Sequence, residues 1–308
     1  MASVRSWFIK HFVRLRIKPL LRGNVSIKKI RGRTNYLASY GWYPILVKRE
    51  RFRVGEIDVA AYSPRQVEPR GTILFVHGGG FCFGSIRMYA DLASRLAAAA
   101  QARVVLPEYR LSPEHRYPAA HEDVMRVYEH LLNKGSQQPL GFALVGDSAG
   151  GALVMATAIA ARDRGLPLPD SLAVISPWVD LTCGGPTYAA NEACDAMLTP
   201  NIMSVCSGAY AHGADVRDPR LSPLFADLKG LPPLLIQVGT DEILLSDSTR
   251  LADAARAAGL DVTLRVYEGL WHVWHLFAWA VPEGKLAIRE LAEFVTGKFD
   301  TECDSVAK

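Results

Sequence analysis

The sequence predicts an α/β protein built on a mostly parallel, doubly wound sheet. From about residue 50 onwards, strand patterns alternate with helical patterns, as they do in strand–helix–strand units. Several strand patterns, such as Thr72–Val76, are continuous apolar runs typical of strands buried on both faces. The chain has 308 residues, 49% of them hydrophobic and 21% charged, which allows a sizeable core and excludes the disordered, collagen-like and coiled-coil classes.

The strands are predicted from their apolar patterns. Residues Gly55–Ala61 alternate between apolar and polar, as a half-exposed strand does. The later strands are short apolar runs, at Thr72–Val76, Val104–Leu106, Phe142–Val145, Leu172–Ile175, Leu234–Val238 and Val262–Val266.

The helices between them show leucine and alanine at helical spacing, and Pro118 suits a first helical turn. They are expected at Met88–Ala100, Pro118–Leu132, Ala149–Arg162, Asp247–Ala258 and Lys285–Lys298. The stretch 180–231 breaks the alternation with Gly, Pro and Cys residues and one helical patch near Pro200–Tyr210. It is therefore predicted to be an insertion after the strand Leu172–Ile175.

The N-terminal segment differs in charge from the rest of the chain. Residues 1–48 contain eleven Lys or Arg and no Asp or Glu, whereas the remainder contains 24 Lys or Arg and 31 Asp or Glu. Residues 4–18 fit a basic amphipathic helix ended by Pro19, with Phe8, Phe12 and Leu15 on one face. Such a helix either packs its apolar side over the body, which we favour, or attaches to an anionic membrane surface.

Cysteine usage and the N-terminus predict the compartment. The five cysteines are widely spaced and form no CxxC pair, which favours free thiols in a reducing compartment over a zinc or redox motif. Basic residues interrupt every apolar run near the N-terminus, so no signal peptide is expected. We expect a cytoplasmic protein without a nucleic-acid partner; peripheral membrane contact through the N-terminus and a homodimer stay open.

The strongest chemical motif is Gly146-Asp147-Ser148-Ala149-Gly150, between a predicted buried strand and a predicted helix. This is the context of a nucleophile elbow, a turn so tight that the flanking residues must be small. Ser148 would stand at the carboxyl end of the sheet, beside the positive end of the following helix. The sequence thus predicts Ser148 as a nucleophile.

A second motif, His77-Gly78-Gly79-Gly80-Phe81, follows the strand Thr72–Val76. Consecutive glycines allow backbone N–H groups to turn towards an anion. Without a following GK[ST] the segment is not a P-loop, and beside the elbow it indicates half of an oxyanion hole. His77 is expected to be structural, because the base should follow the serine in this chain order.

A serine nucleophile needs a histidine base, and the base needs an orienting carboxylate. Asp241 follows the strand Leu234–Val238, and His272 follows the next strand. The favoured order is therefore Ser148, Asp241, His272. Glu242 and Asp247 are rivals to Asp241, which stands nearer the strand end, and His275 is a rival to His272.

Four motifs follow one another along the chain: HGGGF at 77–81, YRLSPEH at 109–115, GDSAGG at 146–151 and SPWVDL at 176–181. With the late blocks around Asp241 and His272, they resemble the hormone-sensitive-lipase-like family (family IV) of α/β-hydrolase carboxylesterases over roughly residues 50–300. Ser112, Val273-Trp274 and the partial match at Asp218-Pro219-Arg220 depart from the family pattern, and none removes a catalytic group.

The resemblance implies an α/β-hydrolase fold with an eight-stranded sheet and a helical cap. Residues 1–50 would form an N-terminal cap segment and 51–308 the catalytic domain, with a cap insertion at about 183–225. By position it makes Ser148 the nucleophile, Asp241 the orienting acid and His272 the base. It implies an oxyanion hole made by the N–H groups of Gly79, Gly80 and Ala149.

These observations predict a serine carboxylesterase that hydrolyses short- to medium-chain esters through an acyl-enzyme. The expected partner is a small-molecule ester, and no metal or organic cofactor is expected. The alternatives are a membrane-surface lipase with residues 4–22 as its anchor, a lactone or acetyl-ester hydrolase, and a receptor that keeps the pocket but not the chemistry. An intact Ser148 and His272 argue against the receptor.

Overall fold

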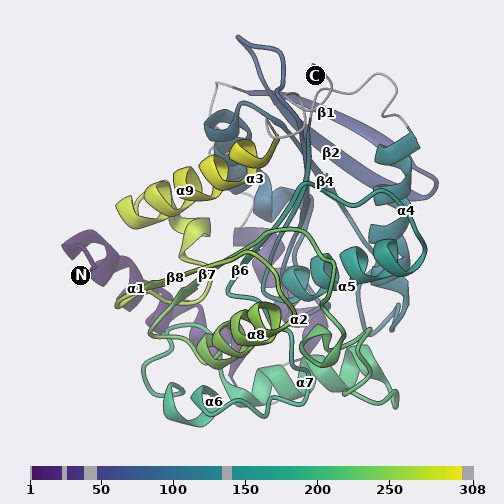
Figure 1. Cartoon of the computed structure of the whole chain (residues 1–308). Helices are drawn as coiled ribbons and strands as arrows, with labels where there is room; N and C mark the ends of the chain where they lie inside the picture. Colours follow the sequence, from purple (N-terminus) through teal and green to yellow (C-terminus); the bar gives the residue numbers. More distant parts are fainter. Residues whose placement is uncertain (1, 23–25, 38–46, 134–140, 300–308) are drawn as a thin grey trace.

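The chain is described by a computed structural model over residues 2–22, 26–37, 47–133 and 141–299. Its centre is an eight-stranded sheet in the order β1-β2-β4-β3-β5-β6-β7-β8 (Figure 1). β1 pairs with β2, and β2 with β4, in antiparallel orientation. The six strands that follow in this order, from β4 through β3 to β8, pair in parallel. The strands are β1 (Val47–Val54), β2 (Ile57–Pro64), β3 (Thr72–Val76), β4 (Arg103–Pro107), β5 (Phe142–Asp147), β6 (Ser171–Ile175), β7 (Leu234–Gly239) and β8 (Val262–Tyr267).

Helices cover both faces of the sheet and the end that carries the motifs. The α-helices are α1 (Val4–Arg16), α2 (Ile27–Leu37), α3 (Ile86–Ala100), α4 (Ala119–Asn133), α5 (Ala149–Asp163), α6 (Thr187–Ala190), α7 (Pro200–Ala211), α8 (Leu245–Ala257) and α9 (Pro282–Phe299). The short 3₁₀ helices are η1 (Lys18–Leu21), η4 (Pro223–Phe225) and η5 (Trp274–Phe277). None of the helices that the structure describes is both long enough and apolar enough to cross a membrane.

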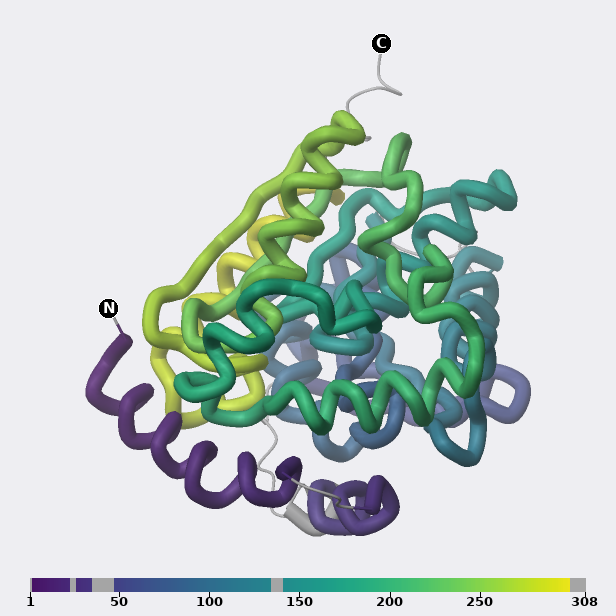
Figure 2. Tube along the Cα trace, turned by 90° about the horizontal axis from the view of Figure 1, so that it is seen from below, coloured from purple at the N-terminus to yellow at the C-terminus, as the bar shows by residue number. Residues whose placement is uncertain are grey.

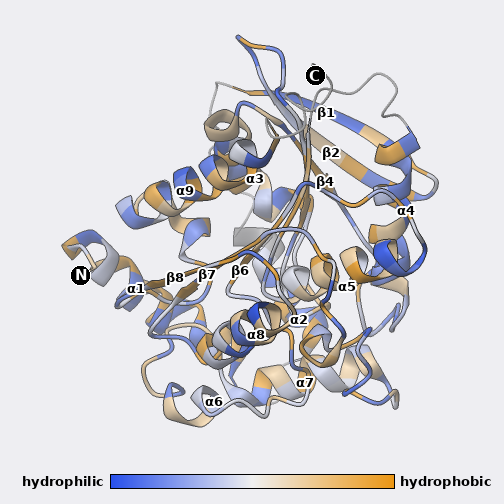
Figure 3. Cartoon of the chain, in the orientation of Figure 1, coloured by the Kyte–Doolittle hydropathy of each residue, from blue (hydrophilic) through white to orange (hydrophobic). Residues whose placement is uncertain are grey.

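The core lies in two layers because successive side chains of a strand point to opposite faces. In β3, Ile73 and Phe75 pack with α3 and α9, whereas Leu74 and Val76 pack with α4, α5 and α8. All five residues of β3 are buried, as are those of β6. Apolar residues accordingly gather along the central strands (Figure 3). The predicted α/β fold is confirmed.

Among the strands and α-helices that the structure describes, β1, α2 and α6 have no counterpart among the predicted ones. β1 has the sequence VKRERFRV, and most of its side chains are exposed, so it lacks the apolar run that marked the central strands. It is an edge strand that pairs along its whole length with β2. Charged side chains on an edge strand are a common protection against pairing with other chains.

The N-terminal helices lie on the same side of the molecule as α7 (Figure 2). The segment expected at 1–50 as a cap contains α1, η1 and α2, and its last residues, 47–50, begin β1 of the sheet; residues 1, 23–25 and 38–46 lie outside the described residues. The insertion expected at 183–225 contains α6, α7 and η4. Leu21 from η1 and Ile202 and Met203 from α7 line one cavity, which supports the proposal that these two segments form a cap.

The structure corrects which face of α1 is buried. The helix packs over the body as favoured, but with Ser6 and Val13 inward. Phe8, Phe12 and Leu15 point away and are 63%, 54% and 71% exposed. The reason is that polar contacts as well as apolar ones hold the inner side of the helix, including an ion pair from Lys10 to Asp241.

Candidate active site

Ser148 stands on a strained turn between β5 and α5. Its backbone angles, φ 52° and ψ −123°, are rare for a residue with a side chain. The turn needs its glycines, because a Cβ on Gly146 would lie 2.5 Å from the carbonyl oxygen of Gly150. A Cβ on Gly150 would lie 2.1 Å from that of Val76. These close approaches give Ser148 the geometry expected of a nucleophile elbow.

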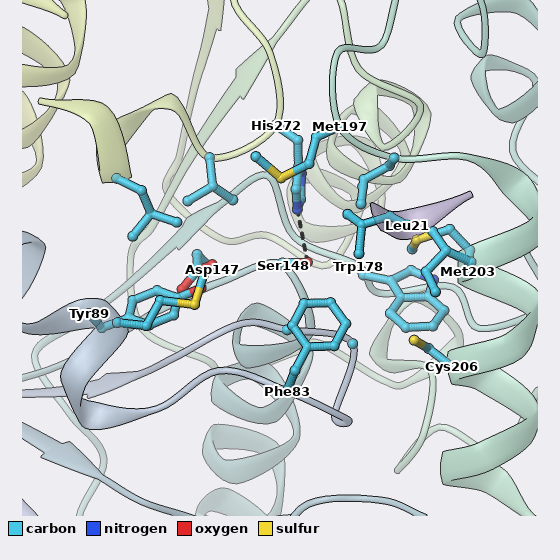
Figure 4. Close-up of a pocket in the computed structure, with 17 residues that line it drawn as sticks. Leu21, Phe83, Tyr89, Asp147, Ser148, Trp178, Met197, Met203, Cys206 and His272 are labelled. Atoms are coloured by element: carbon cyan, nitrogen blue, oxygen red, sulfur yellow. Dashed lines mark hydrogen bonds between the residues drawn. The ribbon is translucent and has the colours of Figure 1, made fainter. Parts of the chain in front are cut away.

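His272 comes to Ser148 from the loop after β8. Its Nε2 lies 3.1 Å from Ser148 Oγ, within hydrogen-bonding distance (Figure 4). Both side chains are almost fully buried. This pair is the arrangement in which an imidazole can accept the proton of a serine hydroxyl.

The carboxylate beside His272 belongs to Glu242, which corrects the choice of Asp241. Glu242 Oε2 lies 3.0 Å from Nδ1 of His272, and Glu242 is fully buried. Its Oε1 accepts hydrogen bonds from the N–H of Gly239 at 2.6 Å and from the hydroxyl of Ser176 at 2.9 Å. The side chain therefore turns back over the end of β7.

Asp241 points the other way, to the N-terminal helix. Its carboxylate accepts a hydrogen bond from Lys10 Nζ, and the same ammonium donates to the carbonyl of Gly269 at 3.3 Å. The third candidate, Asp247, is buried on α8 and accepts hydrogen bonds from the N–H groups of Val179 and Asp180, both at 3.1 Å. Neither aspartate has a hydrogen bond to His272 among the described contacts.

The electrostatics around His272 suit a base held ready for a proton. Burial is the largest influence and by itself lowers the pKa of the imidazole, but the hydrogen bond and the charge of Glu242, together with nearby aspartate charges, outweigh it. The charges of Asp195 and Asp147 act in the same direction, so the pKa of His272 lies above its ordinary value.

The rival histidine, His275, lies apart from this chemistry. It is fully buried, and its Nε2 is 3.0 Å from Oε1 of Gln237 on β7. Burial lowers the pKa of His275 to about 3. His275 therefore stays neutral in the core at any ordinary pH.

The glycine loop after β3 lies beside Ser148. Gly79 and Gly80 have positive φ angles of 112° and 58°, and both line the same cavity as Ser148. A Cβ on Gly79 would lie 2.1 Å from the carbonyl oxygen of Phe83. Within the described part of the chain, the N–H groups of Gly79, Gly80 and Ala149 have no hydrogen-bond acceptor. They are available to an oxyanion.

Asp147, in the middle of the elbow motif, is a residue of the site that sequence reasoning left out. Its two carboxylate oxygens accept hydrogen bonds from the N–H of Gly78 at 2.9 Å and the hydroxyl of Tyr89 at 2.7 Å. Burial raises the pKa of Asp147 to about 7. Asp147 thus fixes the start of the glycine loop against the elbow. Its place beside Ser148 was the only signal in the sequence.

Ser148 and His272 open into a small cavity of about 50 Å³. Figure 4 shows Tyr89 and Asp147 on one side of Ser148, with Trp178 and Met203 on the other. The walls of the cavity are almost entirely apolar. They come from the glycine loop, the elbow, α3, the loops after β6 and β8, η5, the loop before α7, α7 itself and η1. Besides the residues already named, they include Phe83, Met88, Met197, Leu198, Cys206 and Leu276.

The described residues contain no cluster of three or more His, Cys, Asp or Glu side chains placed to hold a metal ion. The expectation that no cofactor is needed stays a prediction.

Comparison with known proteins identifies the family. Residues 73–276 match a family described as having the alpha/beta hydrolase fold. An acetyl-hydrolase of Streptomyces hygroscopicus is 41% identical over 242 residues, covering 79% of this chain and 80% of that protein. An esterase of Acinetobacter venetianus is 37% identical over 226 residues, covering 73% of this chain and 74% of that protein.

Solved structures agree over nearly the whole chain. A crystal structure of EstE5 soaked with p-nitrophenyl butyrate superposes with a TM-score of 0.91 at 37% identity, covering 97% of this chain and 99% of that one. An esterase of the bacterial hormone-sensitive lipase family has the same TM-score and coverage at 34% identity. The chain therefore belongs to the hormone-sensitive-lipase family of α/β-hydrolase carboxylesterases and hydrolyses esters.

Proposed function

We propose that this esterase acts on esters of short acyl chains through an acyl-enzyme on Ser148. The observation that carries the proposal is the 3.1 Å approach of His272 Nε2 to Ser148 Oγ at the bottom of a small apolar cavity. A receptor that had lost its chemistry would not need this contact.

In the first half of the reaction, Ser148 Oγ attacks the carbonyl carbon of the ester while His272 Nε2 takes the hydroxyl proton. The carbonyl oxygen becomes an oxyanion and is stabilised by the N–H groups of Gly79, Gly80 and Ala149. Glu242 holds the imidazole in the tautomer that presents Nε2 to the serine and stabilises its charged form.

The tetrahedral intermediate then collapses. The bond from the carbonyl carbon to the alkoxy oxygen breaks, and the imidazolium gives its proton to the departing alcohol. A water molecule then attacks in the same way: His272 takes a proton from water, and hydroxide adds to the acyl carbon. The bond to Ser148 Oγ breaks, and the imidazolium returns its proton to this oxygen. The products are a carboxylic acid and the free enzyme.

Cavity size and sequence similarity both favour short acyl groups. About 50 Å³ leaves room for an acetyl group or a slightly longer chain when the walls adjust. Acetyl esters are a specific form of the proposal, because a relative of 41% identity is called an acetyl-hydrolase. The p-nitrophenyl butyrate used with EstE5 is an ester of similarly short chain.

The test is a series of nitrophenyl esters from two to sixteen acyl carbons, assayed with the enzyme and its Ser148→Ala variant. We expect the highest kcat/KM at roughly two to six carbons and a loss on the order of a millionfold in kcat for Ser148→Ala. A kcat/KM that rises steadily to sixteen carbons would replace the proposal with a long-chain lipase. Near-normal turnover by Ser148→Ala would refute the acyl-enzyme on Ser148.

A further inference from the structure

The outer face of α1 carries a stripe of exposed apolar side chains. Val4, Trp7, Phe8, Phe12 and Leu15 are between 53% and 74% exposed and recur at the three- and four-residue spacing of one helix face. They are half of the ten large hydrophobic side chains that are exposed among the described residues, although α1 has only 13 residues. An apolar patch of this kind on a surface helix indicates an interaction site.

The opposite face of α1 is held to the body by its own contacts, so the attachment of the helix does not depend on burial of the stripe. Val13 is fully buried, and the Ser6 hydroxyl donates a hydrogen bond to Glu283. Lys10 pairs with Asp241, and just after the helix Lys18 Nζ donates to the carbonyls of Glu192 and Asp195 at 2.8 and 2.5 Å. Figure 2 shows α1 at the rim of the molecule, with one side open.

Positive charges border the stripe on both sides. Successive residues of a helix turn by about 100°, which places Arg5 and Arg16 along one edge of the stripe and Arg14 along the other. Arg14 also donates to the carbonyl of Ala193 at 2.8 Å. Among the described residues no carboxylate pairs with Arg5 or Arg16, and residues 1–49 contain no Asp or Glu.

This charge pattern favours a lipid surface over a second copy of the chain as the occupant of the stripe. A second copy of the chain docked on the same stripe would bring the two sets of arginines together and gain no opposite charge. An anionic lipid surface supplies apolar chains for the stripe and phosphates for its border, as interfacial amphipathic helices require.

We propose that α1 docks this enzyme on anionic lipid surfaces, with the stripe of Val4, Trp7, Phe8, Phe12 and Leu15 in the interface. The next element, η1, supplies Leu21 to the wall of the cavity. Docking would therefore bring the cavity near esters dissolved in the lipid. Only this last consequence rests on the proposed function; the docking itself does not.

The test uses the full chain carrying Ser148→Ala, so that lipids are not hydrolysed, and sedimentation with vesicles of phosphatidylglycerol and phosphatidylcholine. We expect at least tenfold tighter binding to mixed vesicles than to pure phosphatidylcholine, weakening as salt is raised. Phe8→Ser with Phe12→Ser should weaken binding at least tenfold. Arg5→Gln with Arg16→Gln should weaken the preference for phosphatidylglycerol.

A matched control is Val67→Ser, which removes an exposed apolar side chain (44% exposed) from the loop before β3, at the amino end of the sheet. It should bind vesicles like its parent. The proposal is overturned if the Phe8/Phe12 variant binds as well as its parent, or if mixed vesicles bind no better than phosphatidylcholine. It is also overturned if the stripe proves to hold a dimer that the Phe8/Phe12 substitutions separate.

The two proposals are separated by a second assay. The same stripe and arginine substitutions are made in the active enzyme, and its hydrolysis of soluble nitrophenyl butyrate is measured. It should change less than twofold, because no residue of the stripe lines the cavity. If the enzyme hydrolyses the ester normally but does not bind vesicles, the docking proposal is refuted and the proposed function stands. If the intact chain binds vesicles but hydrolyses no ester, the proposed function is refuted and the docking stands.

Discussion

Glu242 and His272 meet through one carboxylate oxygen, while the other is tied to the scaffold. Oε2 lies 3.0 Å from Nδ1 of His272, and Oε1 is held by the N–H of Gly239 and the hydroxyl of Ser176. The backbone end of β7 and the loop after β6 therefore fix the direction from which the imidazole is held. This division of the carboxylate makes Glu242 a positioning residue that can be distinguished experimentally from its neighbour Asp241.

Glu242→Gln should lower kcat on the order of 10⁴-fold, because an amide can favour the wrong tautomer of His272 and carries no charge to stabilise the imidazolium. The matched variant Asp241→Asn keeps the contacts of Glu242 and should lose less than about tenfold. Steady-state kinetics with nitrophenyl butyrate measure both. If Asp241→Asn were the more damaging change, the carboxylate seen beside His272 would not be the one that acts.

The activity should be lost as the pH falls through the pKa of His272, because only the neutral imidazole can accept the Ser148 proton. The ordinary histidine pKa is about 6.5. Glu242, Asp195 and Asp147 raise it here. The acid limb of kcat/KM should therefore have its midpoint above about pH 6.5.

Glu242→Gln supplies the control for this limb. It removes a charge that raises the pKa of His272, so the remaining activity should show a midpoint at lower pH. A midpoint that stays in place would mean that another group controls the limb.

His272→Ala should abolish turnover, whereas His275→Ala should retain most of the kcat of the folded enzyme. His275 contacts Gln237 and lies outside the set of residues that line the cavity. Its removal leaves the buried Gln237 amide oxygen without this partner, so a loss of roughly 1–3 kcal/mol of stability is expected. Kinetics below the melting transition and thermal unfolding separate the two effects. A catalytically dead but folded His275→Ala enzyme would contradict the assignment.

The sequence predicted the central strands well because they are buried on both faces. β3 runs over Thr72–Val76, as expected, and β5, β6 and β7 lie within two residues of their expected bounds. The edge strand β8, which is partly exposed, was also found because of its alternating apolar residues. β1 was not predicted, because its sequence is mostly charged and its strand conformation depends on pairing with β2. A strand that forms through pairing with its neighbour cannot be recognised from its own local sequence pattern.

In the site, too, local sequence patterns located the motifs but could not predict contacts with residues distant in the chain. The elbow and the glycine loop are local motifs, and the sequence alone located them. Choosing between Asp241 and Glu242 by distance from the strand end gave the wrong neighbour, because the longer side chain folds back over β7. Asp241 is instead turned to Lys10, a partner 231 residues away in the chain. Likewise, helical periodicity described both faces of α1 but not which face would be buried.

Removing residues 2–22 should raise KM for short esters, although the nucleophile, base and carboxylate all remain. The deleted segment contains Leu21, which lines the cavity, and Lys18, which holds the carbonyls of Glu192 and Asp195. Asp195 in turn accepts the N–H groups of Met197 and Leu198 at 2.7 and 2.8 Å, and both of these residues are cavity walls.

Lys18→Met tests this chain of contacts without a deletion. It leaves the buried carbonyl of Asp195 without this donor, at roughly 1–3 kcal/mol, removes the partly buried bond to Glu192, and loosens the wall that Met197 and Leu198 form. We expect KM for nitrophenyl butyrate to rise several-fold and the melting temperature to fall, with a smaller change in kcat because Ser148 and His272 stay in place. Arg16→Met, an exposed change on the same segment, should alter neither. Unchanged kinetics in both the truncated enzyme and Lys18→Met would show that the N-terminal segment covers the cavity without shaping it.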